Sequence, residues 1–123
     1  MTKNNIKILI VDDEVDSCHF IQKALVRRGF DVDVAFEGRE ALENIGVTTY
    51  DFIFLDFYMQ GLTGIEVAKV IKGKDVKSII VLTSGYLNDS EMNKDTGISE
   101  FLEKPFSLEE IEALIAKYKK RGK

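Results

Sequence analysis

The feature that most constrains this chain is an alternation, repeated five times, between short apolar runs rich in β-branched residues and longer amphipathic stretches. Such an alternation is typical of βαβ units, in which each helix returns the chain to the same end of the sheet. Near-continuous apolar runs indicate parallel strands that are covered on both faces. The sequence therefore predicts an α/β fold with a five-stranded parallel sheet. The expected strands are residues 6–11, 31–36, 52–55, 78–82 and 101–102.

The stretches between these strands carry apolar residues at helical spacing. In residues 15–28, Cys18, Ile21 and Leu25 share one face, and Gly29 supplies a C-terminal stop. Further helices are expected at residues 40–45, from Gly64 onward, and after Ser107, where Glu110 completes a capping box.

One stretch, residues 86–96, departs from this regular pattern. The alternation requires a helix there, but Leu87 and Met92 are its only aliphatic residues and they lack a 3–4 repeat. We expect a short and loosely held helix.

Length and composition set the class of protein. A chain of 123 residues with a net charge of −4 fits one globular domain, and we expect residues 1–123 to form it without an output domain. The charge argues against a nucleic-acid partner, which requires a clustered basic face. Cys18 is the only cysteine, so no internal disulfide forms. No apolar run is long enough to cross a membrane, and we expect a cytoplasmic protein without membrane partners.

Polar side chains gather where the expected strands end. In an open parallel sheet, ligands bind outside the carboxyl ends of the strands, so residues at these ends are expected to meet. They are Asp12 and Asp13 after the first strand, Asp56 after the third, Thr83 and Ser84 after the fourth, and Lys104 after the fifth.

Three carboxylates at one place require a balancing cation. Two unit charges about 4 Å apart repel each other by roughly 4 kcal/mol at an effective dielectric constant near 20. Mg²⁺ suits such a site, because it takes a few carboxylate oxygens and leaves room for a phosphate. Lys104 offers a fixed positive charge and Thr83 or Ser84 a hydroxyl, so Asp56 is predicted to be the nucleophile of a phosphoryl transfer.

These segments together resemble a response-regulator receiver domain of the CheY-like kind. The resemblance rests on four pieces in the expected order along the chain: residues 11–13, 55–64, 81–85 and 104–106. It implies a single doubly wound (βα)5 domain of the flavodoxin-like class with strand order 2-1-3-4-5.

The resemblance also implies a role for each site residue. Asp56 is the phosphoacceptor and binds Mg²⁺ or Mn²⁺ together with Asp13 and the backbone carbonyl of Tyr58, while Asp12 holds the ion largely through water. Thr83 and Lys104 contact the phosphoryl group. The remaining implied roles are the switch residues, Thr83 and Phe101.

By the same resemblance, the protein is a phosphoacceptor of a two-component system or phosphorelay and not an ordinary enzyme, although it assists its own phosphorylation and dephosphorylation. The phosphoryl group comes from a histidine kinase or a phosphotransfer protein. The signal leaves by altered contact with a downstream protein. The Lys104-Pro105 bond is often cis in this family.

The chain departs from the family pattern at three positions. Gln60 stands where proline is usual, so the loop after Asp56 is less restricted. Tyr58 and Gly85 occupy positions that influence how fast the phosphoryl group is lost.

Simpler interpretations exist for single residues. Asp12 and Asp13, taken alone, are typical of residues that cap a helix. Ser84 is typical of a turn residue, and Phe101 of a residue in the hydrophobic core.

Other interpretations concern the whole chain. It is alternatively a receiver cut from a hybrid histidine kinase or a larger regulator, or a receiver-shaped interaction module that is never phosphorylated. A flavin-binding protein is disfavoured because the acidic residues 12–14 would repel the flavin phosphate. A haloacid-dehalogenase phosphatase is disfavoured because it requires a second aspartate two residues after its nucleophile, where this chain has Tyr58.

Overall fold

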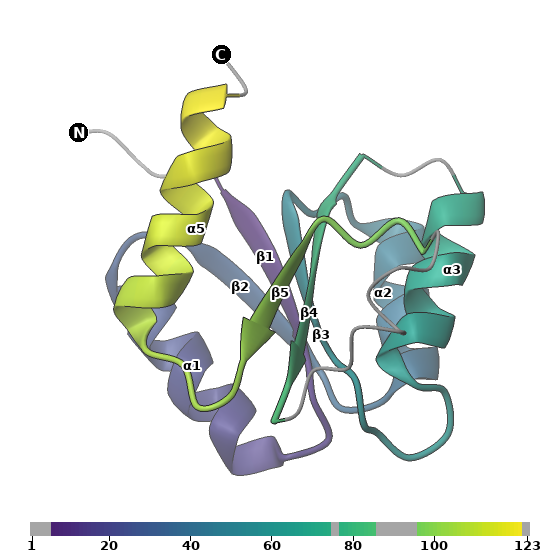
Figure 1. Cartoon of the computed structure of the whole chain (residues 1–123). Helices are drawn as coiled ribbons and strands as arrows, with labels where there is room; N and C mark the ends of the chain where they lie inside the picture. Colours follow the sequence, from purple (N-terminus) through teal and green to yellow (C-terminus); the bar gives the residue numbers. More distant parts are fainter. Residues whose placement is uncertain (1–5, 75–76, 86–95, 122–123) are drawn as a thin grey trace.

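The computed structural model describes residues 6–74, 77–85 and 96–121. Five strands form one parallel sheet in the order β2-β1-β3-β4-β5, which confirms the expected fold class and strand order (Figure 1). The strands are β1 (Lys7–Val11), β2 (Asp31–Ala35), β3 (Phe52–Asp56), β4 (Ile79–Ser84) and β5 (Glu100–Glu103).

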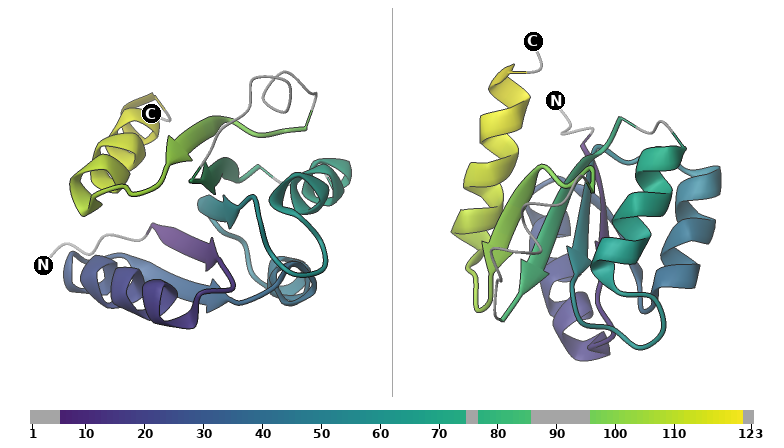
Figure 2. Two further views of the ribbon diagram at one scale, coloured as in Figure 1. Left: turned by 60° about the horizontal axis from the view of Figure 1, so that its bottom comes forward. Right: turned by 45° about the vertical axis from the view of Figure 1, so that its right-hand side comes forward.

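Four described helices cover the two faces of the sheet. They are α1 (Val15–Arg27), α2 (Gly38–Val47), α3 (Gly64–Gly73) and α5 (Leu108–Arg121). α1 and α5 lie on one face, and α2 and α3 lie on the other (Figures 1 and 2). The short helix expected within residues 86–96 falls almost wholly outside the described residues.

Each face of the sheet has its own apolar core, because successive strand residues point to opposite faces. On β1, Leu9 packs into the core beneath α2 and α3, whereas Ile8 packs into the core beneath α1 and α5. Both side chains are fully buried. This two-sided burial explains why the central strands read as continuous apolar runs.

The ends of β3 and β4 lie later than the sequence indicated. Asp56 was expected after its strand and is instead the last residue of β3, and Thr83 and Ser84 likewise belong to β4. The ladder continues because Asp56 pairs with Thr83, and the Phe57 N–H donates to the Thr83 carbonyl at 2.8 Å. Backbone pairing, and not a loop, therefore fixes these three residues.

Capping boxes start two of the helices. The box predicted at Ser107 and Glu110 is confirmed, with hydrogen bonds of 2.8 and 3.1 Å, and α5 buries Ile111, Leu114 and Ile115 as expected. A second box, between Thr63 and Glu66, starts α3 and was not predicted. In the described part of the chain, no helix has both the length and the apolar character required to cross a membrane.

Candidate functional site

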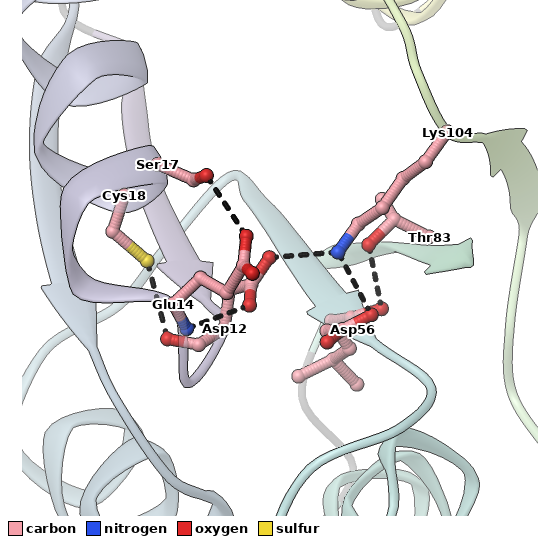
Figure 3. A network of polar contacts seen from close by, with 8 residues as sticks. Asp12, Glu14, Ser17, Cys18, Asp56, Thr83 and Lys104 are labelled. Atoms are coloured by element: carbon pink, nitrogen blue, oxygen red, sulfur yellow. Dashed lines mark hydrogen bonds and ion pairs between the residues drawn. The ribbon is translucent and has the colours of Figure 1, made fainter. Parts of the chain in front are cut away.

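An acidic pocket lies at the carboxyl ends of the strands, as the sequence predicted. Asp12 directly follows β1, Asp56 ends β3, and Lys104 directly follows β5. The Lys104 Nζ lies 2.9 Å from Asp12 Oδ2 and 3.1 Å from Asp56 Oδ1, so one ammonium group joins two buried carboxylates (Figure 3). Residues 92 positions apart in the chain thereby meet in one hydrogen bond.

Asp13 completes the pocket from its exposed rim. Asp12, Asp13 and Asp56 each offer a carboxylate oxygen, and these three oxygens lie within 4.8 Å of one another. With Lys104 as the nearby cation, the four side chains carry a formal charge of −2. An all-oxygen donor set with this charge fits a hard divalent cation such as Mg²⁺ or Mn²⁺.

Four hydrogen bonds hold Asp12 in place. Its N–H donates to the Ala35 carbonyl at 3.1 Å, its Oδ1 accepts from the Glu14 N–H at 3.0 Å, and its carbonyl accepts from the Cys18 thiol at 3.2 Å. The fourth is the bond from Lys104. The N-cap of α1 is Glu14, whose side chain makes no capping bond, so neither Asp12 nor Asp13 is the N-cap residue of this helix.

The electrostatics of the pocket set Asp56 apart. Burial, followed by the negative charge of Asp12, raises the pKa of Asp56 from 3.8 to about 6, although Lys104 acts in the opposite direction. Burial lowers the pKa of Lys104, but its bonds to Asp12 and Asp56 outweigh this and leave that pKa above its usual value. Lys104 therefore remains protonated at neutral pH, and the three carboxylates of the pocket outnumber its one ammonium group.

The hydroxyl of Thr83 lies beside the carboxylate of Asp56 but bonds to the neighbouring strand. Thr83 is buried opposite Asp56 in the sheet, and its Oγ1 donates to the Leu55 carbonyl at 3.4 Å, which is long for a hydrogen bond between oxygens (Figure 3). Ser84 is fully buried, and its carbonyl accepts from the Lys104 N–H at 2.7 Å. That bond brings Lys104 to the pocket, and the Lys104-Pro105 peptide is cis.

Tyr58 and Phe101 are the two other residues for which the sequence predicted a role. The Tyr58 side chain is 62% exposed and stacks on Phe57 with ring centroids 4.5 Å apart. The role of its backbone carbonyl stays a prediction. Phe101 is partly buried opposite Leu82 and packs against the core beneath α2 and α3. Its position agrees with the core interpretation, and its role as a switch also stays a prediction.

The sequence did not reveal the importance of the glycine that begins α3. A Cβ added to Gly64 would lie 2.5 Å from the Asp56 carbonyl oxygen and 2.8 Å from Leu82 Cδ1. The available signal was the pattern of Thr63 followed three residues later by Glu66, which marks a helix start. Nothing in the sequence marks the thiol of Cys18 as a donor to Asp12.

Comparisons with known proteins agree with this geometry. The family model described as "Response regulator receiver domain" matches residues 8–116. The response regulator ArlR of Staphylococcus saprophyticus is 34% identical over 110 residues, which cover 89% of this chain and 50% of that protein. The chain thus spans about half the length of the ArlR relatives it matches.

Solved structures share the fold over nearly the whole chain. The receiver domain of the Francisella response regulator 1452 is 30% identical with a TM-score of 0.86, over 97% of this chain and 100% of that one. The response regulator TrrA of Thermotoga maritima, solved in complex with Mg(2+)-BeF, is 31% identical with a TM-score of 0.79, over 91% of this chain and 97% of that one. The chain belongs to the response regulator receiver domain family, the signalling modules of two-component systems.

Proposed function

We propose that this chain accepts a phosphoryl group on Asp56 and transmits the change through altered protein contacts. The observation that carries the proposal is the convergence of three carboxylates and one ammonium group on a single pocket. A receiver-shaped module that is never phosphorylated would have no use for three carboxylates whose repulsion must be offset.

The reaction that suits the pocket is a transfer from a phosphohistidine. A carboxylate oxygen of Asp56 attacks phosphorus, a bond from oxygen to phosphorus forms, and the bond from nitrogen to phosphorus breaks as the imidazole leaves. Such a transfer asks the protein chiefly for positioning and for neutralisation of charge. Release of the group to water by the same pocket would complete the cycle.

Lys104 and Thr83 are the residues that would hold the phosphoryl oxygens. Lys104 already lies 3.1 Å from Asp56 and is protonated, so it can pair with an oxygen of the new phosphoryl group. Thr83 can turn its hydroxyl from the Leu55 carbonyl toward that group, because its present bond of 3.4 Å is weak.

The donor set fits a divalent cation. Asp13 and Asp56 would bind Mg²⁺ or Mn²⁺ directly, with the backbone carbonyl of Tyr58, and Asp12 would act largely through water. The bound ion would supply positive charge next to the transferring group. Asp12 is already engaged by Lys104 and by the Glu14 N–H, which agrees with an indirect role.

Output from the site would pass through β4 and β5. Inward movement of Thr83 opens space beside Phe101, which packs on the neighbouring strand and would turn inward. If the outward and inward positions of Thr83 and Phe101 define two states, a shift of their populations from 1:99 to 99:1 requires about 5.5 kcal/mol of differential stabilisation. The added charge of about −1.5 to −2 is the source of that energy.

The partners follow from the chemistry. The phosphoryl donor would be a histidine kinase or a phosphotransfer protein, and the recipient of the signal a downstream protein, in a cytoplasmic setting. The net charge of −4 gives no footprint for nucleic acid in this chain.

Intact mass measurement tests the proposal. Incubation with acetyl phosphate and Mg²⁺ should add the mass of one phosphoryl group to the wild type and to Asp16→Asn, an exposed control on α1. The gain should be absent from Asp56→Ala and from samples with excess chelator. An unmodified wild type under these conditions would contradict the proposal and favour the interaction module.

A further inference from the structure

We propose that Gly64 is a positioning residue for the metal site, because its missing side chain lets α3 start directly against the backbone of the phosphoacceptor. This contact fixes residues 57–63, the loop that carries the Tyr58 carbonyl. The inference rests on the proposed function and adds to it the device that holds this ligand loop in place.

The contact leaves no room for a larger residue. A Cβ on Gly64 would lie 2.5 Å from the Asp56 carbonyl oxygen, 3.1 Å from its carbonyl carbon and 2.8 Å from Leu82 Cδ1. Leu82 can change its rotamer, but the Asp56 carbonyl belongs to the backbone of β3 and cannot turn aside. Any side chain at position 64 must therefore push the start of α3 away from Asp56.

The loop is anchored at both ends by hydrogen bonds that meet at Phe57. The Phe57 N–H donates to the Thr83 carbonyl at 2.8 Å, and the Gly64 N–H donates back to the Phe57 carbonyl at 3.0 Å. The capping box adds bonds of 2.8 and 3.2 Å between Thr63 and Glu66. The chain from 57 to 64 thus closes on itself beside the acceptor.

The middle of the loop has less local restraint than its ends. Gln60 lacks the ring by which a proline fixes its backbone φ angle. Gly61 adopts a φ of 81°, which glycine takes at little cost. The position of the Tyr58 carbonyl therefore depends on the anchors, of which the close contact at Gly64 tolerates the least displacement.

The other end of α3 offers a matched control. Gly73 is the last residue of the same helix, and a Cβ added there meets no atom within 4 Å. Gly64→Ala and Gly73→Ala are therefore the same chemical change with opposite steric consequences. Ile71→Val, a change in the buried face of α3, supplies a variant that loses stability by core packing alone.

The test measures Mg²⁺ affinity by calorimetry and, without metal, amide hydrogen exchange in residues 57–63. In Gly64→Ala, Mg²⁺ affinity should fall about tenfold, as is typical when a residue that orients a metal ligand is changed. Amide hydrogen exchange in residues 57–63 should become faster. Gly73→Ala and Ile71→Val should stay within about twofold of the wild-type affinity. A folded Gly64→Ala with wild-type affinity and exchange would overturn the inference.

A second variant decides the matter if Gly64→Ala does not fold. Thr63→Ala removes the capping box at the same junction without a clash and should lower Mg²⁺ affinity by about fivefold. Unchanged affinity in that variant would overturn the inference. A wild type that binds no Mg²⁺ would instead refute the proposed function, while the exchange comparison would still test whether Gly64 holds the loop.

Discussion

Each carboxylate of the acidic pocket has a different environment, which agrees with the different tasks proposed for them. Asp12 is buried and engaged by hydrogen bonds, Asp56 is buried against Lys104, and Asp13 is exposed. Their meeting was predictable from strand ends alone. The detailed hydrogen bonds were not, because the thiol of Cys18 and the carbonyl of Ser84 act through tertiary contacts that no local pattern records.

The raised pKa of Asp56 predicts a pH-dependent cost to folding. The native pKa of about 6 exceeds the ordinary aspartate value of 3.8, so the native state binds more protons than the unfolded state between these values. This contribution is therefore favourable at low pH and is lost as pH rises through 6. Asp56→Asn should raise the free energy of unfolding of the metal-free protein at pH 8 by up to about 3 kcal/mol.

Urea denaturation of wild type and Asp56→Asn from pH 4 to pH 8 measures this difference. The gain should shrink below pH 6 and be small near pH 4. Excess Mg²⁺ at pH 8 should stabilise the wild type more than the variant. A constant difference across this pH range would show that burial of the charge is not its cause.

Lys104→Met tests the internal counter-ion. Lys104 holds the pKa of Asp56 below the value that burial alone would give, so its loss should raise that pKa further. Mg²⁺ affinity should increase, because the lysine no longer competes for the Asp12 and Asp56 oxygens. Carbon NMR titration of Asp56 and calorimetry measure the two effects, with Lys69→Met on the exposed side of α3 as control. A lowered Asp56 pKa would contradict this assignment.

At the scale of the elements, apolar runs located all five strands and helical periodicity located the four described helices. The errors lie at ends: β4 begins at Ile79 and reaches Ser84 where the pattern indicated 78–82, and β5 extends beyond 101–102 on both sides. Polar residues can continue a strand when a neighbouring strand offers hydrogen-bond partners. That information is tertiary and absent from the local pattern. Asp56, Thr83 and Ser84 consequently lie within strands of the sheet and not in loops.

Capping bonds give the last helix a measurable share of stability. Ser107→Ala should lower the free energy of unfolding by about 1 kcal/mol, because the Glu110 N–H loses its partner at the start of α5. Ser107→Asp keeps an acceptor there and should retain wild-type stability in the same urea titration. An equal loss of unfolding free energy in both variants would show that the Ser107 hydroxyl does not stabilise α5 by capping it.

At the scale of the whole molecule, a sheet covered on both faces brings the ends of its strands to one edge. Order 2-1-3-4-5 places β1 and β3 side by side, so Asp12 and Asp56 are neighbours although they lie 44 positions apart in the chain. The same order places β4 beside β5, where Thr83 pairs with Leu102, the residue next to Phe101.

Thr83→Val should separate phosphorylation from its transmission. The variant keeps the volume of Thr83 and the acceptor Asp56, so intact mass should still show one added phosphoryl group. Without the hydroxyl, the amide chemical shifts of β5 should change far less on phosphorylation than in the wild type. Shift changes in β5 as large as those of the wild type would show that the signal leaves by another route.

A crystal structure of this chain with Mg²⁺ and beryllium fluoride, which mimics a phosphoryl group, tests whether Asp56 is the phosphoacceptor. We expect beryllium bonded to an Asp56 oxygen, the metal in contact with Asp13 and Asp56, and the Lys104 ammonium on a fluoride. A structure with both ligands elsewhere, or with Asp56 unmodified and Lys104 still paired to Asp12, would contradict this expectation.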